Sequence, residues 1–339
     1  MSSVVQNTLF LEPAFDGDAV CVAFAANNGF VPVFAACLQS LLDHTSPEKY
    51  YDLILLHTDV SRENQELLTG MLQNRSNLSL RFFNAAPFLR QYDLKTSGHI
   101  SVETYFRFLI QDILPGYRKV LYLDCDLIVN ADVADLYQED VDGFLLAAAR
   151  DPEIAGHVNG ANREIRRYIL QELKLQNPFD YFQAGVLLLN EEEMRRRFPL
   201  AHWLNAASVP YRFHDQDVLN LHCQGSVKFL DMSWNLITDC DHTRVSHILV
   251  HAPEEIQKAY HAAHAAPRII HYAGHRKPWH KPTEDMAHAF WSAARKTPYY
   301  EQLLDTMTRF AAEEVFREER RRRSPYWKLR RWVKKLLIK

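Results

Sequence analysis

Two aspartates stand one residue apart at the end of a short apolar segment in the middle of the chain. Residues 120–123 are predicted to form a buried strand, and Asp124 and Asp126 follow it directly. Two carboxylates at a strand end can converge on one hard divalent cation and share it with a diphosphate. An acidic pair can also simply begin a solvated turn, so this pattern alone leaves both interpretations open.

A phosphatase of the haloacid-dehalogenase type is another interpretation of this pair, with the first aspartate as the phosphoryl nucleophile. Such enzymes normally place Thr or Val two positions after the second aspartate and carry a later acidic pair at another strand end. Here Ile128 occupies that position, and no fitting G-D-x-x-x-D segment follows. The sequence therefore disfavours a phosphatase.

A second group of polar residues follows a short apolar strand predicted at 268–270. His271, Gly274 and Lys277 stand there at a spacing of three residues. An imidazole can complete a metal site begun by two carboxylates, a glycine lets a backbone N–H approach a phosphate, and a lysine supplies positive charge. The chain has 16 histidines, and most histidines are ordinary surface or core residues, so it is the neighbours that single out His271.

The elements that must position these residues alternate between strand and helix, which predicts an α/β fold with a parallel, doubly wound sheet. The ligands of such sheets lie beyond the carboxyl ends of the strands, here just after Ala25 and Leu123. Strands are expected at 19–25, 53–56, 78–83, 120–123, 144–149 and 186–189. Helices are expected at 32–41, 62–72, 102–113 and 214–222, and later at 284–295 and 299–317.

Length and composition are those of a globular protein with a buried core: 339 residues, 47% hydrophobic and 24% charged. The longest apolar runs fall far short of the roughly 20 residues that cross a bilayer. The first 18 residues lack the pattern of a secretory signal, so a cytoplasmic location is expected. The five cysteines form no C-x-x-C pair, and we expect reduced thiols rather than disulfides or a zinc site.

The small net charge of −3 conceals a strongly basic end. Residues 320–339 hold ten Lys or Arg and no acid. Apolar residues recur there at helical spacing, namely Leu329, Trp332, Val333, Leu336 and Leu337. A basic amphipathic helix with tryptophans is typical of an interfacial anchor on an anionic membrane. A solvated charge run and an RNA-binding patch are the alternatives, although we expect no nucleic acid partner.

With these motifs in order along the chain, the sequence resembles the family 8 glycosyltransferases, the retaining group that includes bacterial lipopolysaccharide α-galactosyl- and α-glucosyltransferases. The resemblance covers about residues 19–282. The matching segments are 24–30, 99–101, 104–107, 119–126, 182–186, 214–220 and 271–279.

The resemblance implies a GT-A nucleotide-sugar-binding fold, in which a Rossmann-like mixed sheet is flanked by helices. It also implies four parts. Residues 1–18 would be an N-terminal extension and 19–283 the catalytic domain. Residues 284–319 would be C-terminal helices, and 320–339 the basic amphipathic tail.

The family further implies a UDP-sugar donor bound through Mn²⁺ or Mg²⁺. Asp124, Asp126 and His271 would hold the metal, and Lys277 and the Gly274 amide would hold the diphosphate. The remaining donor contacts implied by the resemblance are Ala25, Asn27, Phe30, His99, Arg107, Cys125, Gln183 and Gly185.

Three consecutive residues that open a predicted helix, Asp215, Gln216 and Asp217, are the catalytic candidates. Asp215 would bind donor-sugar hydroxyls, although helix capping is an alternative for it. Gln216 would lie on the β face of the anomeric carbon. Because an amide is a poor nucleophile, we expect front-face attack by the acceptor, with double displacement through Asp217 as the less favoured mechanism.

The sequence departs from the family pattern near the base and the sugar. The first strand usually ends in A-A-D-D-N-Y, but here Asn27 and Asn28 replace the acids and Phe30 replaces the tyrosine. Phe30 can stack on a base or pack in the core, two roles that we weigh equally. Gln183 stands where the family commonly has N-A-G, which leaves the sugar unassigned.

These observations predict a metal-dependent retaining hexosyltransferase, with galactose or glucose as the sugar. The acceptor would be a cell-envelope or lipid-linked glycan at the inner face of the plasma membrane. The alternative from another class is a non-catalytic module that binds nucleotide-sugars or glycans. It is disfavoured because such a module needs no metal-binding and leaving-group residues together.

Overall fold

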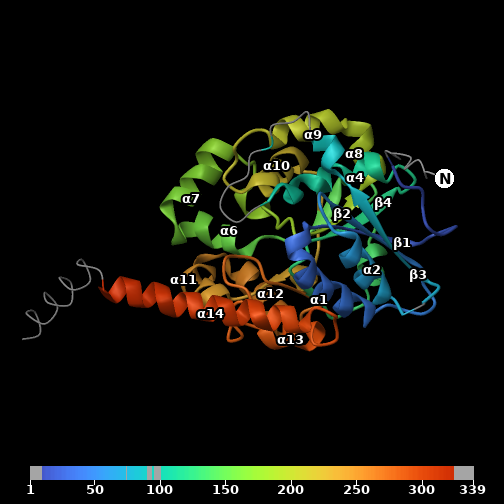
Figure 1. Ribbon diagram of the computed structural model, residues 1–339. Coiled ribbons are helices and arrows are strands. Elements are labelled where there is room, and N and C mark those ends of the chain that lie inside the picture. The colour runs from blue at the N-terminus through green and yellow to red at the C-terminus, as the bar shows by residue number, and fades with distance from the viewer. Residues whose placement is uncertain (1–9, 74, 90–93, 95–100, 324–339) are drawn as a thin grey trace, which may run out of the picture.

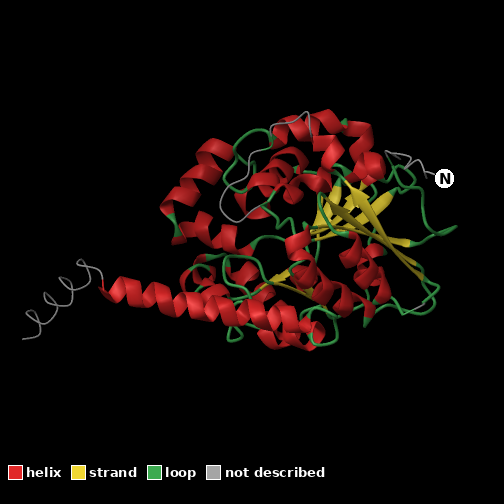
Figure 2. Ribbon diagram, in the orientation of Figure 1, coloured by secondary structure: helices red, strands yellow, loops and turns green. Residues whose placement is uncertain are grey.

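The computed structural model describes residues 10–73, 75–89, 94 and 101–323. Strands occupy the interior of this part of the chain, and helices surround them (Figure 1, Figure 2). Two sheets are formed, and the candidate site lies where they meet.

The larger sheet has seven described strands in the order β3, β2, β1, β4, β7, β6, β8. Their bounds are β1 Val20–Ala25, β2 Tyr51–His57, β3 Leu78–Asn84, β4 Lys119–Leu123, β6 Leu146–Ala148, β7 Val186–Asn190 and β8 Val227–Phe229. All six strands predicted within this sheet are therefore confirmed, with β8 as the one missed.

The sheet is mixed, so the expectation of an all-parallel sheet from element alternation is wrong, whereas the mixed sheet implied by the family resemblance is confirmed. Strands β3, β2, β1 and β4 run parallel, but β7 is antiparallel to both β4 and β6. The reason is that a fully buried apolar segment such as β7 has no feature that encodes its direction. Its direction depends on the route of the chain between strands.

The two faces of β1 show how the sheet forms two layers of core. Val22 and Phe24 pack on one side with the helix α1 (Val31–Leu42), whereas Cys21 and Ala23 pack on the other side with Phe106. Alternating residues of a strand point to opposite faces, and burial on both faces explains why this segment is apolar throughout.

The helices around this sheet leave the carboxyl ends of β1 and β4 uncovered, and the site lies there. Those packed on its first face include α1 Val31–Leu42, α2 Arg62–Gly70 and α5 Val133–Tyr137. Those on the second face include the 3₁₀ segment η2 Val102–Phe108, α4 Ile110–Ile113, α8 Glu191–Arg197, α9 Leu200–Ala207 and α10 His214–Cys223. The single helix predicted at 102–113 is thus divided into η2 and α4.

The smaller sheet carries the second group of polar residues toward the first. Its strands are β5 Leu127–Val129, β9 Leu236–Ile237 and β10 Ile269–His271, with β10 between the other two. His271 pairs with Leu127, and the Tyr272 amide donates to the Asp126 carbonyl, 3.1 Å away. The sequence predicted β10 but missed β5 and β9, because strands of two or three residues are too short to show a period.

The remaining helices form the opposite side of the site and the C-terminal part. Their bounds are α3 Ala86–Leu89, α6 Pro152–Gly156, α7 Arg163–Arg167, α11 Arg244–His247, α12 Glu254–Ala265, α13 Ala287–Ala294 and α14 Tyr300–Arg323. Two π-helical segments, η3 His157–Ala161 and η4 Tyr168–Leu173, flank α7. The helix predicted at 284–295 begins only at Ala287, because Met286 has a left-handed backbone with φ of 55°.

Helix α14 is longer than predicted and projects from the body of the protein (Figure 1). None of the helices in the described ranges is both long and apolar enough to span a bilayer. The predicted amphipathic helix from residue 324 onward lies outside the described residues. All five cysteines are free and buried.

Candidate active site

A cavity of about 630 Å³ opens beyond the carboxyl ends of β1 and β4. It brings together fourteen of the sixteen site residues predicted from the sequence. These are Ala25, Asn27, Phe30, Arg107, Asp124, Cys125, Asp126, Gln183, Gly185, Asp215, Gln216, His271, Gly274 and Lys277. Asp217 does not line the cavity, and His99 lies outside the described residues.

The two aspartates and the histidine form a compact cluster at one end of this cavity. Ligand atoms of Asp124, Asp126 and His271 all lie within 4.8 Å of one another. His271 Nε2 is 3.4 Å from Asp126 Oδ1 and 3.8 Å from Asp124 Oδ2. Two carboxylate oxygens and one imidazole nitrogen are a donor set suited to Mn²⁺ or Mg²⁺.

Neighbouring residues orient the imidazole and keep space beside it. His271 Nδ1 lies 2.9 Å from the buried Asn235 Oδ1, so a proton on Nδ1 would leave Nε2 free to face the carboxylates. A Cβ atom on Gly185 would lie only 2.3 Å from His271 Cε1 and 2.8 Å from Asp124 Oδ2. Only glycine therefore fits at this position.

Lys277 supplies a positive charge at the edge of the cluster. Its ammonium donates to Asp126 Oδ2 at 2.6 Å and to the Tyr272 carbonyl at 2.7 Å. Burial alone would raise the pKa of Asp126, but the charges of Lys277 and His271 outweigh it and hold the pKa below its ordinary value. Asp126 therefore stays ionised.

Arg107 joins the metal-site candidates to the start of α10. The buried guanidinium lies 3.0 Å from Asp124 Oδ1 and 3.1 Å from Asp215 Oδ2, and it also donates to the Ala184 carbonyl. Thr104 donates to the other oxygen of Asp215 at 2.5 Å. Asp215 is thus held by an ion pair and a hydroxyl, and its side chain does not cap the helix.

The three consecutive residues of α10 have different surroundings. Gln216 accepts a hydrogen bond from the Ala184 amide at 2.9 Å and donates one to Asp151 Oδ2 at 3.1 Å. Asp217 is fully buried and accepts hydrogen bonds of 2.7 Å from the hydroxyls of Tyr168 and Tyr181. Of the three, only Asp217 does not line the cavity, which argues against the less favoured mechanism of double displacement through it.

Phe30 packs against the core and also faces the cavity. Its ring packs edge-on against Trp279 with the ring centroids 5.8 Å apart, and it also lines the cavity. The Asn27 side chain accepts a hydrogen bond from the Phe30 amide at 3.1 Å. The turn after β1 is therefore fixed by the asparagine that replaces the family's aspartate.

The opposite wall of the cavity was missed by the sequence analysis. It is formed mainly by α6, η3 and α11, through Asp151, Glu153, Ile154, His157, Arg244 and Ile248. Asp151 is the key residue, because one of its oxygens caps α6 and the other accepts from Gln216. An aspartate before Pro152 is a recognisable helix start, but nothing in the sequence brings it to Gln216.

Comparison with known proteins decides the family. The model of glycosyl transferase family 8 matches residues 21–283, which is more than half of the chain. The chain belongs to glycosyl transferase family 8. It therefore has a glycosyl transfer function, and the mixed sheet with its flanking helices is the GT-A fold of that family.

Relatives of this family 8 glycosyltransferase support the assignment. A putative glycosyltransferase of Haemophilus influenzae is 27% identical over 266 residues, which cover 77% of this chain and 73% of that protein. A lipopolysaccharide 1,3-galactosyltransferase of Salmonella typhimurium is 23% identical over 335 residues, or 93% and 92% of the two chains. The apo structure of the bifunctional glycosyltransferase WbbM is similar with a TM-score of 0.78 and 27% identity. This comparison covers 88% of the present chain but only 53% of WbbM.

Proposed function

We propose that this family 8 glycosyltransferase moves a hexose, galactose or glucose, from UDP to a cell-envelope or lipid-linked glycan with retention of configuration. The observation that carries the proposal is the meeting of Asp124, Asp126, His271 and Lys277 in one cavity with Gln216. Residues 19–283 would form the catalytic domain, in agreement with the extent of the family match.

The cluster of Asp124, Asp126 and His271 fits a divalent ion in both chemistry and space. Its ligand atoms lie within 4.8 Å of one another, and the missing side chain of Gly185 keeps the room beside them open. When bound, Mn²⁺ or Mg²⁺ would neutralise the charge that develops on the departing diphosphate.

Lys277 and Gly274 are proposed to hold the same diphosphate from the chain itself. Lys277 lines the cavity, and its ammonium, which donates to Asp126, would attract an anion bound there. Gly274 has a φ of 110°, a conformation that other residues rarely adopt. The glycine therefore allows a bend of the loop that would expose its amide to a phosphate oxygen.

The arrangement on α10 favours front-face attack. The side-chain oxygen of Gln216 already accepts a hydrogen bond from a backbone amide, and the carboxylate of Asp217 accepts hydrogen bonds from two tyrosine hydroxyls. Neither side chain is therefore available as a nucleophile. The acceptor hydroxyl would attack the anomeric carbon on the face from which UDP departs. Its proton would pass to the leaving phosphate oxygen, while Asp215 binds sugar hydroxyls.

The phosphatase alternative needs Asp124 as a free nucleophile. Instead, Asp124 Oδ1 accepts from Arg107 at 3.0 Å and from the Tyr122 hydroxyl at 3.1 Å. The test of both functions is a panel of UDP-sugars with Mn²⁺ beside a panel of phosphomonoesters. We expect UDP release from at least one sugar and no phosphate from the monoesters, and the reverse result would contradict the proposal.

We further propose that the basic tail attaches the enzyme to the inner face of the plasma membrane. The sequence of residues 320–339 supports this, and α14, which leads into the tail, exposes Val315 and Phe316 by 60% and 68%. Removal of residues 320–339 should abolish co-sedimentation with anionic vesicles and leave UDP-sugar hydrolysis almost unchanged. A full-length chain that ignores such vesicles at low salt would contradict this attachment.

A further inference from the structure

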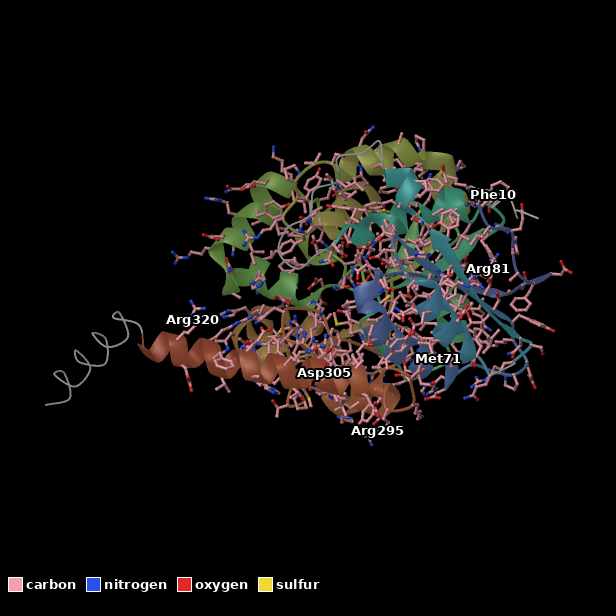
Figure 3. All side chains as sticks on the ribbon, viewed as in Figure 1. Phe10, Met71, Arg81, Arg295, Asp305 and Arg320 are labelled. Carbon is pink, nitrogen blue, oxygen red and sulfur yellow. The ribbon has the colours of Figure 1, made fainter. Side chains whose placement is uncertain are left out.

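Helix α14 packs against the loop that carries two candidate donor-site residues. The loop spans 272–280, directly after His271 at the end of β10, and contains Gly274 and Lys277. On α14, Leu303 is buried in one apolar cluster with Trp279 of the loop, and Met307 packs against the same cluster. Figure 3 labels Asp305 in the packed part of this helix and Arg320 in the projecting part.

Two further residues continue the same face of α14 onto the loop. Phe310 stacks on His280 with the ring centroids 4.5 Å apart and the planes within 7°. Glu314 lies four residues later, and its Oε1 is 2.8 Å from Nη1 of Arg276. Positions three and four apart on a helix share one face, so the face from Leu303 to Glu314 follows the loop over about three turns.

Arg276 connects α14 to a second segment beside the cavity. Its Nε lies 3.0 Å from Asp241 Oδ1. Asp241 directly follows Cys240, which lines the cavity, and its amide donates to Glu284 at 3.0 Å. The guanidinium therefore holds three parts of the chain together: the loop, the segment around Asp241, and α14.

Arg276 itself does not line the cavity, although its neighbours do. Gly274, His275 and Lys277 all contribute to the cavity wall, whereas Arg276 points toward Asp241 and Glu314. Its effect on a bound donor can therefore act only through the loop. The loop is also tightened by the His280 amide, which donates to the Lys277 carbonyl at 3.0 Å.

We propose that Glu314 is a positioning residue for the donor site. Through Arg276 it fixes the loop in the conformation that presents Gly274 and Lys277 to the diphosphate of the donor. This inference rests on the proposed function. It makes α14, which lies outside the residues matched by the family model, a working part of the donor site.

The test compares Glu314→Ala with Glu313→Ala in the full chain. Glu313 is the matched control, because it lies next to Glu314 but is 63% exposed and pairs only with Arg317 on the same helix in the described contacts. Calorimetric titration with UDP and Mn²⁺ should show a Kd raised roughly three- to tenfold in E314A and unchanged in E313A. The KM for UDP-sugar should rise in proportion, with kcat changed less than about twofold.

Two more measurements separate positioning from a general loss of stability. Amide hydrogen exchange of residues 272–281, measured without metal, should be faster in E314A and unchanged in E313A. The double variant Arg276→Ala with Glu314→Ala should bind UDP no more weakly than Arg276→Ala alone, because both act through one contact.

Wild-type affinity and exchange in E314A would overturn the proposal, and so would a Kd that rises equally in E313A. Additive losses in the double variant would overturn it as well. A wild-type chain that binds no UDP would contradict the proposed function instead. In that case the exchange rates would still decide whether Glu314 fixes the loop.

Discussion

Two aspartates that line the same cavity are held in opposite ways. On the donor side, Asp126 is flanked by Lys277 and His271, which hold its pKa below the ordinary value. In the opposite wall, Asp151 has amide partners instead, and burial together with the charge of Glu153 raises its pKa. At Asp126 two cationic neighbours outweigh the effect of burial on the pKa, whereas at Asp151 burial and the charge of Glu153 outweigh the opposing charge of Arg244.

The two sides of the cavity therefore suit different ligands. The donor side combines fixed charges of both signs, which suits a cation and a diphosphate. The wall around Asp151 also carries charge, but Glu153 and Arg244 pair with each other at 2.7 Å. Together with its hydrogen bonds and the apolar Ile154 and Ile248, this paired wall suits a neutral sugar surface. The following predictions test this division, beginning with the largest expected effect.

Removing one charge from the metal-site candidates should have the largest effect. Asp126→Asn should lower UDP release at least about 100-fold, because an amide cannot supply the charge that holds a cation against a diphosphate. Activity would be measured over a range of Mn²⁺ concentrations, with Asp305→Asn on the exposed side of α14 as the control. Turnover close to wild type in Asp126→Asn would show that the metal assignment is wrong.

The loss of Lys277 should have the next largest effect. Lys277→Ala should weaken the use of UDP-sugar roughly tenfold or more, since one charge-assisted hydrogen bond contributes about 1.5–3 kcal/mol. Steady-state kinetics would be compared with those of Lys258→Ala, an exposed lysine on α12. Unchanged kinetics would move Lys277 from the donor site to the surface.

A substitution in the opposite wall should leave donor binding intact. In Asp151→Asn one oxygen can still cap α6, but the new amide nitrogen opposes the Nε2 donor of Gln216. We expect kcat to fall about tenfold with little change in the KM for UDP-sugar, from one unsatisfied donor. Asp231→Asn, which alters a helix cap outside the cavity, is the control. A KM raised as much as in Lys277→Ala would contradict the division of the cavity.

Glu191 is a buried acid that does not line the cavity, and it should affect stability alone. Glu191 is 1% exposed, its carboxylate has no hydrogen-bond partner among the described residues, and burial raises its pKa from 4.5 to about 8. The folded state therefore binds this proton more tightly than the unfolded state. This contribution to stability is complete below pH 4.5 and is lost as the pH rises toward 8.

Glu191→Gln should remove this loss of stability at high pH, because the amide side chain carries no titrating proton. At pH 8 it should raise the free energy of unfolding by a few kcal/mol, on the order expected for such a shift, without changing kcat. Denaturant unfolding at pH 5 and pH 8 would measure it. An equal effect of the substitution at both pH values would show that Glu191 is already ionised in the folded protein.

Much of the donor side could be predicted from the sequence because its residues lie in short motifs at strand ends. Asp124 and Asp126 directly follow β4, and His271 ends β10, so local order along the chain brings each to the edge of a sheet. The position of Asp217 could also have been inferred. Residues two positions apart on a helix are separated by about 200° around its axis, so Asp215 and Asp217 cannot face the same cavity.

The residue types of the donor side, most strands and helices, and the family can be predicted from the sequence, because each depends on local pattern and composition. The direction of β7, the contact of Asp151 with Gln216, and the ion pair of Arg276 with Glu314 depend on tertiary packing. The last two join residues 65 and 38 positions apart. Such pairs form only when whole elements pack, and no local period or motif encodes which side chains then meet.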